Sequence, residues 1–347
     1  MGGYIVSFVP PTVSSTSVTS SSTRSVSPAP SVWSMTSSLR AEAYVQEFGR
    51  DLNNFSEIYR LPADEEELER LDRQHEIISE IMGKYVPPLP QVMAEDVPGE
   101  RKAVLDLGCG SGAWIMEAAL DFPHCNAVGI DLVPMQSPYM PSNCRSEVDD
   151  INLGLEHFYG DFNVVHCRFI SAGIRDYAHM IDQISHVLRP GGLIDLTEWD
   201  FHCYDENHHR IELDVTTIEE PWFPRWMAYF KMAVQRRGGG VDAGTHIHDW
   251  VSRHARFEDV NYNEYFVPAT PWRTENPIDL RIGAAVRDDI QVFLKSGRPL
   301  LLGSGVSEQL VNELQANAHK ELTEDNTRHY IRVQSVYARK RHRLPYG

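Results

Sequence analysis

The sequence predicts an α/β fold in which a mostly parallel sheet carries helices on both faces. Short apolar runs alternate with helix-length segments from about residue 103 to residue 198. Strands separated by helices of this length imply right-handed crossovers and a parallel sheet. Two β-rich runs, 257–267 and 328–339, then close the chain and bring the expected number of strands to seven.

The N-terminal segment, residues 1–40, is expected to be disordered. From about residue 11 to residue 38 it consists mainly of Ser and Thr with scattered Pro. Such a segment buries too little apolar surface to offset the entropy lost on ordering. Arg24 and Arg40, with no acidic residue before Glu42, leave a mitochondrial transit peptide as the alternative interpretation.

Residues 41–98 are expected to form a helical lid before the first strand. Between 41 and 85 the apolar residues fall at spacings of three and four, and charged residues fill the opposite face. The acids at 64–66 suit the first turn of a helix, where the helix dipole favours negative charge. A proline-rich connector from Pro87 to Pro98 ends this segment.

A main α/β domain is predicted over 99–347. Its first five strands are expected at 103–107, 127–131, 145–148, 162–167 and 193–198, with helices at 112–121 and 174–188. Two insertions, at about 203–255 and 270–325, are expected to be mainly helical. The first of them is rich in Trp, His and Tyr, and the second includes a helix-like stretch at 306–322.

A glycine-rich turn carries the clearest chemical signal. Gly108, Gly110 and Gly112 follow the first strand directly and open a helix. Glycine permits the tight turn and lets backbone N–H groups approach a ligand closely. Dinucleotide-binding folds use a related GxGxxG turn, so a glycine-rich turn alone is weak evidence. The GxGxG spacing, Asp106 two residues earlier, and the Arg-Pro-Gly-Gly of 189–192 favour S-adenosylmethionine, because a carboxylate suits an ammonium group better than a pyrophosphate.

Acidic residues end the next two strands. Asp131 can accept hydrogen bonds from both hydroxyls of a ribose. After the third strand, Asp150 is the preferred contact for an adenine amino group, with Asp149 next and a solvated acidic pair as the plain alternative. The predicted cofactor site also includes the neighbouring residues Cys109, Leu132 and Ile151.

Methyl transfer requires alignment of a nucleophile, exclusion of water and, for some acceptors, removal of a proton. Candidates for these tasks are residues just after the fourth and fifth strands. They are His166, Arg168, Glu198, Trp199, Asp200 and His202. We predict His166, Glu198 and Asp200 as catalytic, because a histidine or carboxylate can act as a base. His166 and Arg168 are also predicted to contact the cofactor, with a packed strand-end histidine as the alternative for His166.

Other patterns exclude or leave open several functions. The formal net charge of −17 argues against general binding of nucleic acid or anionic membranes, and no apolar run is long enough to span a bilayer. None of the histidines forms an HExxH set and none of the cysteines a CxxC pair, so no metal site is expected. The aromatic run from Trp222 to Phe230 has helical spacing, which indicates either core packing or the wall of an apolar pocket.

Taken together, these residues resemble the fungal LaeA-like methyltransferases, a class I family associated with secondary metabolism. The likeness extends from about Tyr59 to Lys340. It is carried by 105–112, 129–136, 148–150, 165–168, 189–192 and the Arg-Leu-Asp-x-Gln-His of 70–75. The resemblance implies a class I methyltransferase fold that binds S-adenosylmethionine through Asp106, the three glycines, Asp131 and Asp150, with Tyr59 or His75 covering the cofactor.

Two functions follow as hypotheses. The first is methylation of an oxygen or nitrogen of a small molecule in fungal secondary metabolism. The second is a nuclear regulator that acts through protein partners or methylates protein. An NAD(P)-dependent oxidoreductase is a third and weaker interpretation of the glycine turn. A cytoplasmic location is expected, and the basic run 339–343 leaves nuclear import open. A protein partner or a homodimer is also left open.

Overall fold

The computed structural model describes residues 41–94, 99–135, 137, 139–324 and 327–342. All of them belong to one compact unit, Met35–Gly347. The disorder predicted for residues 1–40 therefore concerns a segment outside the described residues.

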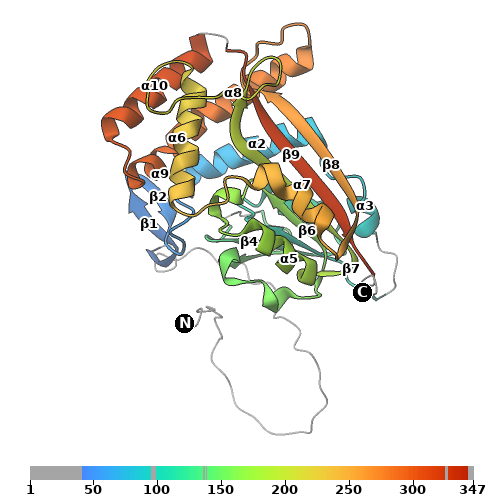
Figure 1. Cartoon of the computed structure of the whole chain (residues 1–347). Helices are drawn as coiled ribbons and strands as arrows, with labels where there is room; N and C mark the ends of the chain where they lie inside the picture. Colours follow the sequence, from blue (N-terminus) through green and yellow to red (C-terminus); the bar gives the residue numbers. More distant parts are fainter. Residues whose placement is uncertain (1–40, 95–98, 136, 138, 325–326, 343–347) are drawn as a thin grey trace. The chain divides into compact units, whose positions relative to one another are not determined.

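A seven-stranded sheet forms the centre of this unit, in the order β5-β4-β3-β6-β7-β9-β8 (Figure 1). The strands are β3 (Ala103–Leu107), β4 (Asn126–Asp131), β5 (Cys144–Val148), β6 (Phe162–Arg168), β7 (Leu188–Tyr204), β8 (Phe257–Pro268) and β9 (Tyr330–Lys340). Strands β3 to β7 pair in parallel, and β9 is antiparallel to both β7 and β8. The predicted mostly parallel, seven-stranded α/β fold is confirmed.

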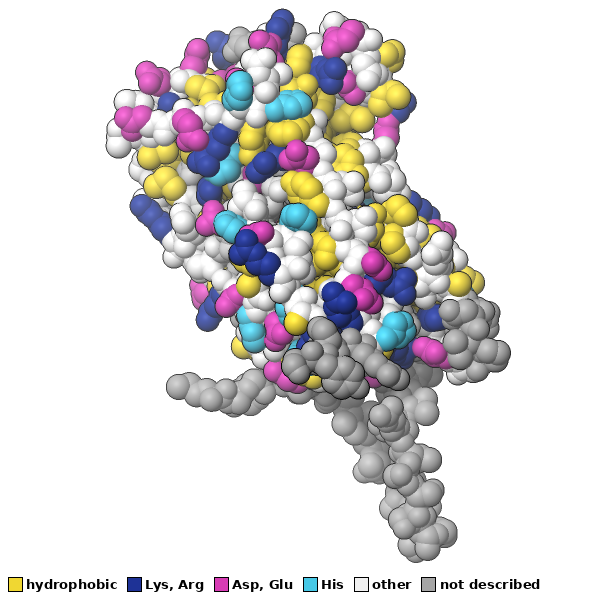
Figure 2. Space-filling model, turned by 45° about the vertical axis from the view of Figure 1, so that its right-hand side comes forward, with side chains coloured by type: hydrophobic (Ala, Val, Ile, Leu, Met, Phe, Trp, Pro, Cys, Tyr) yellow, Lys and Arg dark blue, Asp and Glu magenta, His cyan; other side chains and the backbone are white. Residues whose placement is uncertain are grey.

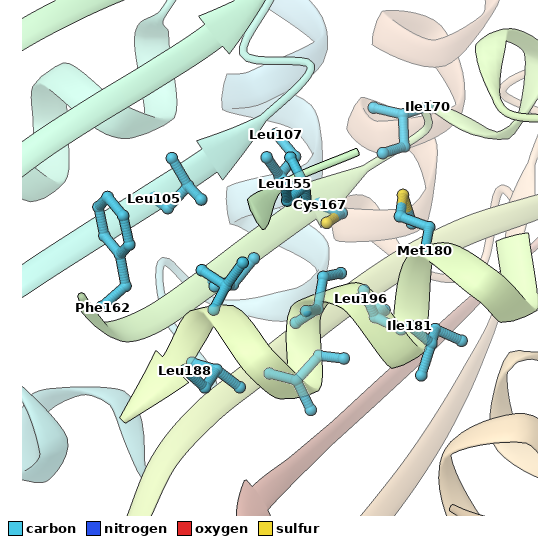
Figure 3. Close-up of a cluster of buried hydrophobic side chains, with 14 of the residues drawn as sticks. Leu105, Leu107, Leu155, Phe162, Cys167, Ile170, Met180, Ile181, Leu188 and Leu196 are labelled. Atoms are coloured by element: carbon cyan, nitrogen blue, oxygen red, sulfur yellow. The ribbon is translucent and has the colours of Figure 1, made fainter. Parts of the chain in front are cut away.

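One face of the sheet packs against α5 (Tyr177–Val187) and α7 (Ala243–Arg253). Figure 3 shows Leu105 and Leu107 of β3 and Leu196 of β7 on the same side as Met180 and Ile181 of α5. These side chains are almost fully buried. Burial of this apolar surface is the main favourable contribution to folding on this side of the sheet.

The opposite face packs against α4 (Ala113–Asp121) and the short α3 (Leu89–Val92). Trp114 and Ile115 of α4 contact an apolar layer that includes Val104 and Val164 of the strands. Because both faces are covered, the central strands are almost continuously buried, as in other parallel sheets.

A second group of helices gathers beyond the ends of β7, β8 and β9 (Figure 1). It consists of α6 (Trp222–Arg236), α8 (Pro277–Ser296), α9 (Arg298–Gly303) and α10 (Glu308–Glu324). These helices bury their own core, which includes Phe223, Trp226 and Phe230. The helices predicted within the two insertions are therefore present, although residues 205–221 form no helix.

The helical pattern predicted over 41–85 is wrong for the first part of this range, whereas the predicted acidic first turn at 64–66 does begin a helix. Residues 44–53 form a hairpin of β1 (Tyr44–Glu47) and β2 (Arg50–Asn53) instead. Phe48 and Gly49 both adopt positive φ in its two-residue turn, the conformation that matches the twist of a tight hairpin. The helix α2 begins only at Glu65 and ends at Met82, capped by the Asp64 side chain, which accepts the Glu67 N–H at 3.2 Å.

The long strand β7 is a second difference, because residues 201–204 were expected to be helical. They stay extended since β7 pairs with β9 as far as Tyr204 opposite Tyr330. Three short 3-10 helices, η1 (Ile151–Leu153), η2 (Glu156–Phe158) and η3 (Ser171–Gly173), complete the elements around the sheet.

Charged side chains of both signs are interspersed over the face drawn in Figure 2, with apolar side chains between them. Among the described residues, no helix combines the length and the apolar character needed to cross a membrane.

Candidate functional site

A cavity of about 220 Å³ opens at the carboxyl ends of the central strands. It lies where β4 and β6 leave β3 on opposite sides, which is the usual place for ligands in an open α/β sheet. Strand ends and loops form one side of the cavity, and α2, α6 and α8 form the other. Helix α2 therefore lies over the strand ends, and both its role as a lid and the domain boundary at residue 98 stay predictions.

The glycine turn forms the part of the cavity beside β3. Gly108 and Cys109 both donate their backbone N–H groups to the Ile130 carbonyl, at 2.8 and 2.9 Å. Gly108 and Gly112 have φ values of 70° and 83°, and a side chain at either position would collide with Ile170 or Met135. The turn requires glycine at these positions for conformational and steric reasons together.

Asp131, at the end of β4, faces this turn. Its Oδ2 accepts the Gly110 N–H at 2.9 Å, and its Oδ1 lies 3.4 Å from the Val133 nitrogen. Burial raises the pKa of the Asp131 carboxyl, and the backbone donors oppose that shift. The carboxylate is thus fixed in orientation and retains lone pairs for the hydroxyl groups of a ligand.

Asp149 and Asp150 both line the cavity after β5. Asp150 caps η1, because its Oδ1 accepts hydrogen bonds from the Asn152 backbone N–H at 3.0 Å and from the Asn152 side chain at 2.8 Å. Asp149 lies 3.2 Å from His157 Nε2, and burial raises the pKa of its carboxyl. Both acids line the same part of the cavity, and the preference for Asp150 stays a prediction.

His166 of β6 is held by two neighbours. Its Nδ1 donates to Asp106 Oδ1 at 2.8 Å, and its ring stacks on Trp114 with a centroid distance of 3.7 Å. Asp106 and His166 are cross-strand partners in the β3–β6 pair, which explains why they meet although 60 residues separate them. With Nδ1 engaged by the carboxylate, Nε2 is the nitrogen that can interact with another group.

A polar chain runs from the cavity to the surface of α4. Arg168 Nη2 donates to His75 Nδ1 at 2.9 Å, and His75 Nε2 donates to Glu117 Oε2 at 3.0 Å. These two contacts require the neutral tautomer of His75 that carries its proton on Nε2. Burial and the nearby Arg168 guanidinium lower the pKa of His75, in agreement with a neutral ring.

The other end of the cavity is mainly apolar, apart from the charged side chains of Arg70 and Asp289. Its walls come from the strand ends, α6 and α8, and they include aromatic side chains. These are Phe169, Trp199, Phe223, Phe230 and Phe293. The aromatic run of 222–230 therefore serves both purposes considered from the sequence, since Trp226 is buried in the helical core while Phe223 and Phe230 also face the cavity.

Most of the predicted site residues line this cavity. They are Tyr59, His75, Asp106, Gly108, Cys109, Gly110, Asp131, Leu132, Asp149, Asp150, Ile151, His166 and Arg168. Gly112 shapes the turn without lining the cavity, and its left-handed backbone precedes the first residue of α4. The roles of these residues toward a cofactor stay predictions.

Glu198 and Asp200, two of the residues predicted as catalytic, are not among the residues that line the cavity. Their side chains lie on the other face of β7 from Trp199, and both are fully buried. The Glu198 carboxylate accepts hydrogen bonds from Ile170 N, Ser171 N, Ser171 Oγ and Tyr177 Oη. Asp200 accepts from the Tyr204 hydroxyl and pairs with the Arg332 guanidinium at 2.6 Å. Their contacts hold the loop at 170–173 and the β7–β9 pair in place.

Trp114, Asn152 and Asp289 are among the cavity residues that were not predicted from the sequence. Trp114 had a readable signal, because it lies two residues after the last glycine of the turn. Asn152 bridges the Asp150 carboxylate, the Gly173 carbonyl and the Arg175 N–H, which fixes the adjacent loops. Asp289 lies in the second insertion, where no motif marked it.

The charges of the cavity select among ligand classes. Four of its carboxylates, those of Asp106, Asp131, Asp149 and Asp150, line the end beside the glycine turn. Such a surface suits a ligand with an ammonium group, hydroxyls and an amino-substituted base, and it would repel the pyrophosphate of a dinucleotide. Among the described residues, no group of three or more His, Cys, Asp or Glu could hold a metal ion.

Comparison with known proteins agrees with this chemistry. Residues 75–256 match the family model described as a methyltransferase domain. The chain is 47% identical over 298 residues to the secondary metabolism regulator laeA of Coprinopsis cinerea, covering 85% of this chain and 73% of that protein. The chain belongs to the LaeA-like family of methyltransferases. S-adenosylmethionine is its cofactor.

More distant relatives carry enzyme names. The methyltransferase pytC of Aspergillus terreus is 29% identical over 217 residues, which are 62% of this chain and 62% of pytC. Among solved structures, the phosphoethanolamine N-methyltransferase 2 of Haemonchus contortus in complex with S-adenosyl-L-methionine has a TM-score of 0.40 and 18% identity. That match covers 78% of this chain and 57% of the other.

Proposed function

We propose that this methyltransferase transfers a methyl group from S-adenosylmethionine to an oxygen or nitrogen of a small molecule in secondary metabolism. One observation carries the proposal. The acidic end and the aromatic end are parts of the same cavity, which is lined by residues from Asp131 at one end to Phe293 at the other. A donor held at the acidic end and an apolar acceptor at the other would share this space without intervening bulk water.

The residues at the acidic end fit the donor. The glycine turn allows close approach of the backbone, which side chains at Gly108 and Gly112 would prevent. Asp131 would accept the ribose hydroxyls, and Asp150 or Asp149 the adenine amino group. Asp106, fixed by His166, would face the ammonium group. When bound, S-adenosylmethionine supplies an electrophilic methyl group on a sulfonium centre.

The other predicted residues complete the arrangement. His166 orients the Asp106 carboxylate and presents Nε2 as the group that would contact donor or acceptor. Arg168 and His75 hold α2 against α4 through Glu117, so the lid stays over the strand ends. Glu198 and Asp200 do not line the cavity, and their buried contacts favour a structural role over a catalytic one.

Methylation assays with labelled S-adenosylmethionine test the proposal. The purified protein is incubated with a fractionated small-metabolite extract and, separately, with a protein extract from the same cells. Label in a small product supports the proposed function. Label in protein alone contradicts the proposed function and supports the regulatory alternative. The 47% identity to a secondary metabolism regulator is the observation that favours this alternative. Three further points stay predictions whatever the result. They are a location in the cytoplasm or nucleus, the lack of direct nucleic-acid binding, and the presence of a protein partner or homodimer.

A further inference from the structure

A buried ion-pair cluster lies at the aromatic end of the cavity, between α2 and α8. Arg70 donates through Nε and Nη2 to the Glu67 carboxylate, at 3.1 and 2.7 Å. Its Nη1 donates to Asp289 Oδ1 at 3.1 Å. The Ser296 hydroxyl donates to the second oxygen of Glu67. One guanidinium is thus shared by two carboxylates, and the cluster has one more negative charge than positive.

Two members of this cluster, Asp289 and Arg70, line the cavity. The Glu67 side chain is 1% exposed and does not line the cavity, whereas that of Asp289 is 13% exposed. Asp289 also accepts a hydrogen bond from the Gln74 side chain, yet burial raises the pKa of its carboxyl, and Arg70 only partly opposes that shift. The negative charge of an ionised Asp289 is therefore only partly balanced by groups of the protein itself.

The positive charges around the cavity do not supply that compensation. Among the described residues that line it, the cationic side chains are Arg70 and Arg168. Arg70 is engaged by both carboxylates of the cluster, and Arg168 donates to His75. A positively charged ligand group beside Asp289 would balance the excess charge.

Aromatic rings next to Asp289 suit the same ligand. Phe293, one turn further along α8, packs against Trp199 and Phe230 with centroid distances of 5.6 and 5.0 Å. The Arg70 guanidinium already lies over the Phe293 ring, 5.3 Å from its centroid. The faces of aromatic rings attract cations, and their area also favours an apolar body.

We propose that the methyl acceptor is an amine with an apolar, aromatic-sized body, and that Asp289 recognises its ammonium group. This proposal rests on the proposed function and makes it specific. For transfer, the ammonium gives one proton to the Asp289 carboxylate. The nitrogen lone pair then forms a bond to the donor methyl carbon while the carbon–sulfur bond breaks and its electrons remain on sulfur. The products are an N-methyl ammonium and S-adenosylhomocysteine, and the proton on Asp289 leaves to solvent.

Three probes of similar shape and different charge test this recognition: phenethylamine, phenethyl alcohol and phenylacetate. Their dissociation constants are measured by calorimetry with the full chain saturated with S-adenosylhomocysteine. We expect the amine to bind at least about tenfold more tightly than the alcohol, and phenylacetate to bind most weakly. The proposal is overturned if the amine and the alcohol bind equally tightly, if phenethyl alcohol or phenylacetate binds more tightly than the amine, or if no probe binds.

Asp289→Asn, which keeps the shape of the side chain, should remove the preference for the amine. Asp288→Asn is the matched control, because Asp288 is the exposed neighbour on α8 and pairs with Arg287. The control should retain the preference, and a preference that survives in Asp289→Asn contradicts the assignment. Binding of S-adenosylhomocysteine is measured for every variant. If the wild-type protein does not bind S-adenosylhomocysteine, the proposed function itself is refuted. If it binds S-adenosylhomocysteine but shows no preference for the amine, only the role of Asp289 is refuted.

Discussion

Replacing Glu198 with glutamine tests the role of this residue. Its contacts indicate that it stabilises the fold, whereas its position at the end of the fifth predicted strand suggested a role in catalysis. Its side chain is fully buried and accepts four hydrogen bonds, at 2.7 to 3.1 Å. Burial nevertheless raises the pKa of Glu198 to about 7, because the donors only partly replace the water that an ionised carboxylate has lost.

The magnitude follows from this shift. Raising the pKa of a carboxyl from 4.5 to about 7 corresponds to about 3 kcal/mol, at about 1.4 kcal/mol for each tenfold change in acidity. The folded protein binds this proton more tightly than the unfolded chain does. Glu198 therefore contributes stability below pH 4.5 that is lost as the pH rises through about 7.

Urea unfolding of the wild-type protein and Glu198→Gln, at several pH values between 4.5 and 8, measures the effect. The free energy of unfolding of the wild type relative to the variant should fall by about 3 kcal/mol across this range. Glu212→Gln, at an exposed position, should show no such trend. A difference that does not change with pH refutes the reasoning. A variant that keeps its affinity for S-adenosylhomocysteine but loses all activity would restore the catalytic interpretation.

Further predictions concern the donor end of the cavity. Asp131→Asn should weaken S-adenosylhomocysteine binding about ten- to a hundredfold in calorimetry, because a hydrogen bond to a charged group contributes about 1.5–3 kcal/mol; unchanged affinity would mean that the ribose lies elsewhere. Gly112→Ala should lower the free energy of unfolding by about 1–3 kcal/mol, since its left-handed backbone and the nearby Met135 both oppose a side chain; a urea midpoint equal to that of the wild type contradicts this. Dialysis against a chelator should leave methyl transfer unchanged, and activity restored by a divalent cation would show that a metal is used.

The sequence alone predicted the sheet and most residues of the acidic end of the cavity. The signals there are local: the glycine turn lies within seven residues of Asp106, Asp131 ends a recognisable apolar run, and Asp150 follows the short, mostly polar strand Cys144–Val148. Strand ends of a parallel sheet meet at one edge, so local motifs at successive strand ends identify one site. The hairpin at 44–53 was missed because its turn contains no strong hairpin dipeptide such as Asn-Gly.

Tertiary structure decided which side chains face the cavity. In β7, Trp199 lines it while the adjacent Glu198 and Asp200 lie on the other face. Polar and apolar residues alternate along most of β7 from Ile194 to Cys203, but both faces of the sheet are covered and both sets of residues are largely buried. The alternation therefore does not show which side of the strand faces the cavity. Contacts between residues that are far apart in the sequence were equally impossible to read from it. Arg70 and Asp289 are 219 residues apart, and only the packing of α2 against α8 brings them together at the end of the cavity where the acceptor would bind.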